Sequence, residues 1–172
     1  MGKPNIIFIF SNVTTQWKPL LGAPSTTGLC TPDMALVDDG NGDVTISGTA
    51  NSSTFTYKGK TYTTYPATGT TLAVQRGKKP TFVFNVVDAG GASNSFFLNG
   101  AALKNLGANG GTGGVNFPDL QVQVANDGST TLNLQDDNKA AVGTTSSFDV
   151  WVLVQDAQGN VGLIDPLVTN SN

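Results

Sequence analysis

The sequence predicts an all-β protein, with residues 1–172 forming a single β-sandwich domain. Three observations support this prediction. Strong helix formers are scarce, because the chain has no glutamate and few lysines and alanines. Threonine, valine and phenylalanine, which favour pleated and half-buried surfaces, are frequent. Short apolar runs recur between clusters of Gly, Pro, Asn and Asp at intervals of about 8–12 residues, which is typical of a sandwich.

The apolar runs predict about ten mostly antiparallel strands. The first strand, residues 5–13, is apolar on both faces from Ile6 to Phe10, so we expect it at the centre of a sheet. Residues 150–154 are also apolar on both faces, which predicts a second central strand. A place for that strand beside the first is one arrangement that the pattern allows.

Turn residues between pairs of strands predict four hairpins. The paired segments are 34–38 with 43–47, 54–57 with 61–65, 120–125 with 130–135, and 147–155 with 161–164. Further strands are expected at 71–75, 81–88 and 95–98. The fold has at most one short helix, expected at 99–106, with Asn99 as its N-cap and Gly107 as its stop.

Several classes of function are excluded by residues that the chain lacks. Without histidine, neither a Ser-His-Asp nor a Cys-His arrangement can form within the chain. The single cysteine, Cys30, excludes an internal disulfide or a cysteine-based zinc site and is expected to be structural. Aspartate pairs brought together by folding would be the remaining route to hydrolysis. We therefore expect a protein that is not an enzyme.

Charge and hydropathy limit the partners and the location. The net charge is −3 and the nine basic residues are dispersed, which argues against a nucleic-acid partner. The longest apolar run has only the five residues from Ile6 to Phe10, so we expect neither a membrane span nor a signal peptide. A cytoplasmic protein is the resulting expectation.

Aspartate-rich turns are the candidate metal sites. Asp39, Asn41 and Asp43 place oxygen ligands at alternate positions, as an EF-hand loop does at its start. The loop then departs from that motif, so a hairpin turn is the favoured interpretation. Asp136 and Asp137 offer further oxygen ligands. Calcium held between loops is the one cofactor that these residues would bind, and no cofactor is the alternative.

A predicted hairpin that carries several tyrosines is the candidate ligand-binding surface. Tyr57, Tyr62 and Tyr65 lie among threonines, and a tyrosine offers a flat apolar face with a hydroxyl group. Such a surface suits stacking on a sugar ring or on a partner protein. Cross-strand aromatic pairs that only stabilise the hairpin are the competing interpretation.

The C-terminal part of the chain carries a series of characteristic segments, at 72–77, 81–87, 96–100, 122–138, 148–154 and 156–159. They are followed by a short ending, Asp165 and Pro166 with Asn170 four residues after the proline. By these segments, and most specifically by the ending, the chain resembles the DP-EP family, a small group of bacterial proteins of unknown role. The resemblance implies an immunoglobulin- or cupredoxin-like sandwich, without copper because the histidine ligands are missing. Pro166 is expected to end the last strand, and Asp165 to accept backbone hydrogen bonds there.

A weaker similarity is to bacterial inclusion-body proteins of the AidA/PixA type, which also end with Asp-Pro after a sandwich strand. Taken together, the sequence favours a non-enzymatic binding or self-assembling sandwich whose partner is itself or another protein. The low net charge of −3 supports self-assembly because it weakens repulsion between copies. The alternative is a lectin-like carbohydrate-binding module, with calcium assisting the binding of a glycan.

Overall fold

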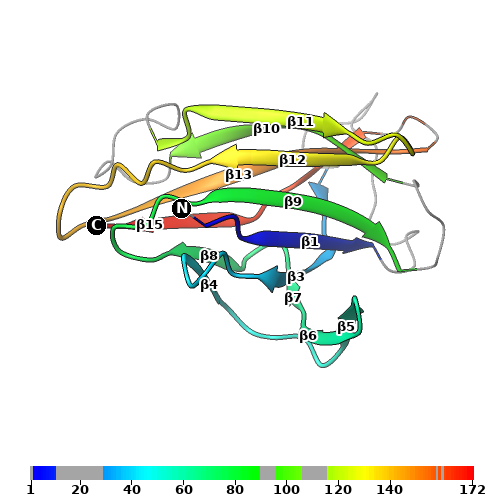
Figure 1. Cartoon of the computed structure of the whole chain (residues 1–172), viewed down its shortest axis with the longest axis horizontal. Coiled ribbons are helices and arrows are strands. Elements are labelled where there is room, and N and C mark those ends of the chain that lie inside the picture. Colours follow the sequence, from blue (N-terminus) through cyan, green and yellow to red (C-terminus); the bar gives the residue numbers. More distant parts are fainter. Residues whose placement is uncertain (1, 11–28, 90–95, 106–115, 158, 160) are drawn as a thin grey trace.

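The fold is a β-sandwich made of two large sheets and one extra hairpin (Figure 1). The computed structural model describes residues 2–10, 29–89, 96–105, 116–157, 159 and 161–172. Within these residues the regular structure consists of strands, which confirms the predicted all-β class. No helix among them is long and apolar enough to cross a membrane.

Sheet A holds the first strand at its centre, as its apolar sequence predicts. Five of the six residues of this strand are buried. It pairs in parallel with residues 81–88 on one side and antiparallel with residues 33–38 on the other. In order across the sheet, the strands are β11 (Asp119–Val124), β12 (Thr130–Gln135), β9 (Thr81–Asp88), β1 (Asn5–Phe10), β3 (Asp33–Asp38) and β7 (Tyr65–Pro66).

Sheet B is built around the longest strand of the fold, β13 (Thr145–Asp156). One edge of β13 pairs with β10 (Phe96–Asn105), and the other edge pairs first with β15 (Leu167–Ser171) and then with β14 (Val161–Ile164). The remaining strands continue outward from these, as β2 (Leu29–Cys30) beside β14, β8 (Thr71–Val74) beside β15, and β4 (Val44–Ser47) beside β8.

The main core fills the space between the two sheets. Alternate side chains of each strand point inward, because successive residues of a strand face opposite sides. Phe8 stacks on Phe84 from sheet A, with ring centroids 5.5 Å apart, and Phe148 meets Phe117 edge to face. Cys30 is fully buried in this core, as expected of a structural cysteine.

A third, two-stranded element lies outside the sandwich. The strands β5 (Thr54–Tyr57) and β6 (Lys60–Thr63) form a hairpin, seen at the lower edge of Figure 1. Its aromatic residues pack on a small second core on the outer face of sheet A. That core consists of Ile7, Ile9 and Ala35. The central strand β1 is therefore covered on both faces.

Three of the four predicted hairpins are confirmed, namely β5–β6, β11–β12 and β13–β14. The fourth, 34–38 with 43–47, is wrong. Its strands form, but β3 belongs to sheet A and β4 to sheet B, so the chain crosses between sheets instead of folding back. Gly40, Asn41 and Gly42 all adopt positive φ, at 65°, 69° and 80°. This conformation suits a sharp corner as well as a hairpin turn.

Two further expectations are corrected. Residues 99–105 belong to β10 instead of a helix, because Ala101 and Leu103 pair with the long strand β13 and pack on the core. A β-bulge lies between Leu98 and Gly100, and it contains Asn99, the predicted N-cap of the helix. Residues 150–154 lie in sheet B, so they do not neighbour β1.

Asp165 and Pro166 separate two strands: β14 ends before them, as predicted, but it is not the last strand, because β15 follows. β14 ends at Ile164 and β15 begins at Leu167, and both keep the same register with β13. The Val150 amide still donates to the Pro166 carbonyl at 3.0 Å, so only the bond that would need a proline N–H is lost. On the edge away from β13, β14 pairs with β2 and β15 pairs with β8. The interruption therefore lies where the neighbouring strand changes.

Candidate ligand-binding cleft

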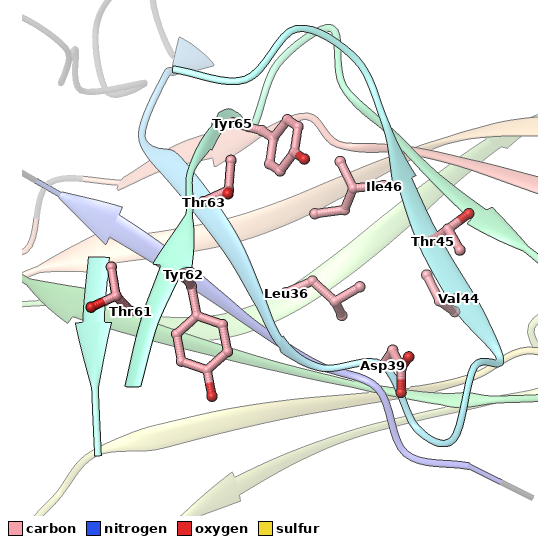
Figure 2. Close-up of a pocket in the computed structure, with 9 residues that line it drawn as sticks. All are labelled: Leu36, Asp39, Val44, Thr45, Ile46, Thr61, Tyr62, Thr63 and Tyr65. Carbon is pink, nitrogen blue, oxygen red and sulfur yellow. The ribbon is translucent and has the colours of Figure 1, made fainter. Parts of the chain in front are cut away.

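A cleft of about 430 Å³ opens between the β5–β6 hairpin and the corner that joins β3 to β4. It forms because β3 belongs to sheet A and β4 to sheet B, so the two strands separate. β6 and β7 lie beside the space between them. Figure 2 shows the rings of Tyr62 and Tyr65 on one wall, the β4 residues on the other, and Leu36 between them. The lining residues are Leu36, Asp39, Val44, Thr45, Ile46, Thr61, Tyr62, Thr63 and Tyr65.

The cleft combines an apolar floor with a polar rim. Leu36 and Ile46 are half-buried, whereas the hydroxyl-bearing Thr45, Thr61 and Thr63 are exposed. Asp39 adds an exposed carboxylate at the corner. An apolar surface bordered by a few polar groups is the usual composition of a small-molecule site.

A second, shallower hollow of about 600 Å³ adjoins the first on the other side of Tyr62. The two hollows share Leu36, Asp39 and Tyr62, and the second adds Lys60. It also includes Asp38, whose carboxylate already accepts the Gly40 amide at 2.9 Å. Tyr62 therefore borders both hollows.

The hairpin is held in place by hydrogen bonds at its base. Asn51 donates its side-chain amide to Asp33 Oδ1 at 2.8 Å, and its backbone amide to the Thr64 carbonyl at 2.8 Å. The buried Thr64 hydroxyl donates to the Ser53 carbonyl at 2.9 Å. These bonds fix β6, and with it Tyr62, relative to β3.

The structure brings together two of the three predicted tyrosines. Tyr62 and Tyr65 line the cleft, but Tyr57 does not. Tyr57 stacks on Phe55 at 6.1 Å, and the Lys58 ammonium lies 5.2 Å from its ring centre. The Phe55–Tyr57 contact lies within one strand, so it differs from the cross-strand aromatic pair that sequence analysis kept as its alternative.

The predicted metal ligands of the 39–43 turn are not directed at one point. Asp39 faces the cleft, and Asn41 is exposed. The buried Asp43 carboxylate accepts the Gly2 amide at 2.8 Å and lies 3.4 Å from the Lys78 ammonium. Both Asp43 oxygens therefore already have positively polarised partners.

Asp136 and Asp137 diverge, although they are adjacent in sequence. Asp137 is half-buried and accepts the Gln135 side-chain amide at 2.8 Å. Asp136 points inward and is fully buried. Removal from water raises the pKa of Asp136 to about 7, an effect that hydrogen bonds from Asn138 and Asn170 oppose.

The predicted Asp165, Pro166 and Asn170 motif separates into two environments. Asn170 faces the interior, where its side-chain amide donates to Asp136. Asp165 is half-buried on the outer side of sheet B, and its Oδ1 has no hydrogen-bond partner in the described part of the chain. Burial, and a hydrogen bond shared with the Asp149 carboxyl, raise the pKa of Asp165 to about 6.

Folding brings the carboxyl groups of Asp149 and Asp165 close enough together for the Asp149 charge to raise the pKa of Asp165.

Sequence analysis missed the apolar half of the cleft, because Leu36 and Ile46 have the pattern of ordinary core residues. It also missed the neighbours of Asp136 that lie far away in sequence.

Among the described residues, no group of three or more His, Cys, Asp or Glu side chains is placed to hold a metal. No protein-family model matches the chain, and no curated protein matches it either.

Proposed function

We propose that the protein is a non-enzymatic binding protein, and that the cleft beside Tyr62 takes a saccharide. The observation that carries this proposal is the position of the Tyr62 ring, which lines both hollows next to the Asp39 carboxylate. A pyranose has an apolar face of C–H groups and a rim of hydroxyls. Tyrosine stacks on the first, and carboxylate and threonine oxygens accept hydrogen bonds from the second.

The charge and shape of the cleft favour a neutral and elongated glycan. Asp39 and Lys60 carry opposite charges and both line the second hollow, so neither an acidic nor a basic ligand gains from both. The two adjoining hollows offer room for more than one sugar ring. Asp38 and Asp39 are the two carboxylates among the lining residues, and the Asp38 carboxylate already accepts the Gly40 amide. Asp39 is therefore the one carboxylate beside Tyr62 that accepts no hydrogen bond described above, which agrees with binding without hydrolysis.

Calorimetric titration with a panel of neutral oligosaccharides tests this function. We expect binding by the wild type and at least a tenfold loss of affinity in Tyr62→Ala and in Asp39→Ala. Tyr57→Ala is the matched control, because it removes a tyrosine that packs on the same second core but lies outside the cleft. Equal losses in Tyr57→Ala and Tyr62→Ala would show a loosened hairpin and argue against the site. Absence of binding at millimolar concentrations would overturn the proposal.

A second candidate function, self-assembly, is favoured by the edge strand β11. Leu120, Val122 and Val124 are 39%, 40% and 69% exposed, and β11 forms one edge of sheet A. An apolar edge strand with open backbone groups is a template for pairing with another chain. A second copy would add its own β11 antiparallel to the first, which closes a two-fold symmetric dimer.

Light scattering after size-exclusion chromatography tests self-assembly. The wild type should change from monomer to dimer as its concentration rises, and Val122→Lys should stay monomeric. Gln121→Lys is the control, because its side chain faces the opposite side of β11. A wild type that stays monomeric at about 1 mM would contradict self-assembly, while leaving saccharide binding untouched.

A further inference from the structure

A cluster of buried polar side chains joins the two sheets near the C-terminus. Asp136 and Asn138 follow β12 of sheet A, whereas Ser146 and Asn170 belong to β13 and β15 of sheet B. All four are 0–3% exposed. Ser146 and Asn170 are directly opposite each other in the β13–β15 ladder, and both face the interior.

Hydrogen bonds hold these side chains together. Oδ1 of Asp136 accepts the Asn138 backbone amide at 2.8 Å and the Asn170 side-chain amide at 2.9 Å. The Asn138 side-chain amide donates to the carbonyls of Lys78 and Ser171, at 3.1 and 2.8 Å. Asn138 therefore lies beside the residue that follows Asn170.

One oxygen of each side chain is left over. Asp136 Oδ2, Asn138 Oδ1, Ser146 Oγ and Asn170 Oδ1 are buried and have no hydrogen-bond partner among the described residues. Six side-chain atoms of this kind occur in the described part of the chain, and four of them belong to these neighbouring residues. An unpaired buried polar atom costs about 1–3 kcal/mol, so such a concentration indicates a missing partner.

The missing partner must supply positive charge or hydrogen. Both asparagine amide nitrogens face only oxygen acceptors, so rotating either amide would place oxygen against oxygen. The leftover atoms of Asp136, Asn138 and Asn170 are therefore acceptors. Hydrogens come from water and from the Ser146 hydroxyl itself, whereas positive charge comes from a cation.

We propose that the four leftover oxygens bind a hard cation, with Ca²⁺ as the best-fitting ion. A carboxylate, two amide carbonyls and a hydroxyl form an all-oxygen donor set of the kind that Ca²⁺ takes, with water completing its six to eight ligands. The cation also compensates Asp136, whose carboxylate forms no ion pair with a described lysine or arginine. With one charged ligand, the site belongs to the weak end of the calcium range, about 10⁻⁴–10⁻³ M.

The cation acts as a structural clamp between the sheets, separate from the proposed saccharide cleft. None of the four residues lines that cleft. Loss of saccharide binding and loss of the cation are therefore distinguishable. Asp137, which sequence analysis paired with Asp136, takes no part because its carboxylate faces Gln135.

Calorimetry and thermal unfolding of EDTA-treated protein test the site, with CaCl₂, MgCl₂ and NaCl as probes. We expect one Ca²⁺ per chain and a rise in Tm on the order of 5–10 °C at a hundredfold excess over Kd. Asp136→Asn and Ser146→Ala should each weaken binding at least tenfold. Asp39→Asn, in the turn with the alternative metal motif, should leave it unchanged.

Three other results would contradict the calcium site or the choice of calcium as its ion. No binding of Ca²⁺ or Mg²⁺ at 10 mM, on the order of tenfold above the weak limit, would mean that water alone fills the cluster. Binding that survives both variants, or that Asp39→Asn removes, would place the ion elsewhere. If Asp136→Asn fails to fold by circular dichroism, Ser146→Ala decides, because it deletes only an unpaired hydroxyl. A Tm response to Na⁺ equal to that to Ca²⁺ would overturn the choice of calcium.

Discussion

Asn170 Nδ2 lies 2.9 Å from Asp136 Oδ1 and donates a hydrogen bond that joins β15 of sheet B to the segment after β12 of sheet A. Both side chains are fully buried. A hydrogen bond to a buried carboxyl group is among the stronger polar contacts in a fold, because neither partner has water as an alternative. The two sheets are thus held at this end by a polar contact, in addition to the apolar core.

Asn170→Ala should lower the free energy of unfolding by about 2–3 kcal/mol, since it deletes this bond and a longer one to Asn116 Oδ1 at 3.3 Å, and leaves the Asp136 carboxyl poorly paired. Urea unfolding measures the loss. Asn172→Ala is the comparison, because the half-buried Asn172 donates a single side-chain hydrogen bond, to the Ala140 carbonyl at 3.0 Å. Its cost should be about 1 kcal/mol or less. Equal costs for the two variants would contradict a special role for Asn170.

Asp165 should make stability depend on pH. Its pKa is raised to about 6 from an ordinary 3.8, with burial and Asp149 raising it and Lys104 opposing them. A raised pKa means that folding favours the protonated carboxyl, so this contribution is full below about pH 4 and is lost as the pH rises through 6. Asp165→Asn should therefore raise Tm at pH 7 and change it little at pH 4. A Tm difference that grows toward low pH would contradict this assignment.

Gly40 should tolerate no side chain. A Cβ on Gly40 would lie 2.7 Å from both the backbone nitrogen and Cδ of Pro4, whereas a Cβ on Gly59 would meet nothing within 4 Å. Both glycines have positive φ, at 65° and 78°. Gly59→Ala therefore reports the conformational cost alone, about 1–2 kcal/mol. Gly40→Ala should cost a further 1–3 kcal/mol or so in chemical denaturation. Equal costs would show that the segment around Pro4 moves away freely.

Asn51→Ala should loosen the β5–β6 hairpin without unfolding the sandwich. It removes the bonds to Asp33 and Thr64 that hold the base of the hairpin. A loss of about 1–2 kcal/mol would speed hydrogen exchange of the hairpin amides roughly 5- to 30-fold, while β1 and β13 keep their protection. Ser52→Ala, at an exposed neighbouring position, should change nothing. Uniformly faster exchange would indicate global destabilisation instead.

Strand positions were predictable because alternation and turn residues are local properties. The segments 54–57, 81–88, 120–125 and 130–135 all form strands within a residue or two of the prediction. Partners across the sandwich were not predictable in this way. The turn around Asn41 has the composition of a hairpin, and only the packing of Pro4 against Gly40 and the pairing of β4 with β8 distinguish a corner from a hairpin.

The candidate sites show the same limit. Tyrosines on a hairpin predicted a binding surface, and Tyr62 and Tyr65 line one cleft in the structure. Asp136 was singled out for metal binding beside Asp137, yet its neighbours in space are Asn170 and Asn138. Adjacent residues on extended backbone diverge, so the oxygens that surround Asp136 come from segments that no local spacing connects.

The central place of β1 also affects how the chain is synthesised. Its parallel partner β9 ends at Asp88, so the nascent strand from Ile6 to Phe10 emerges long before that partner exists. At about 5–20 residues per second, the wait is roughly 4–16 s. During this interval β3 is already present as one partner of β1, but the opposite edge of this apolar strand stays unpaired. An unpaired apolar edge is a template for pairing with another chain, so the strand order itself sets how long the growing chain carries that risk.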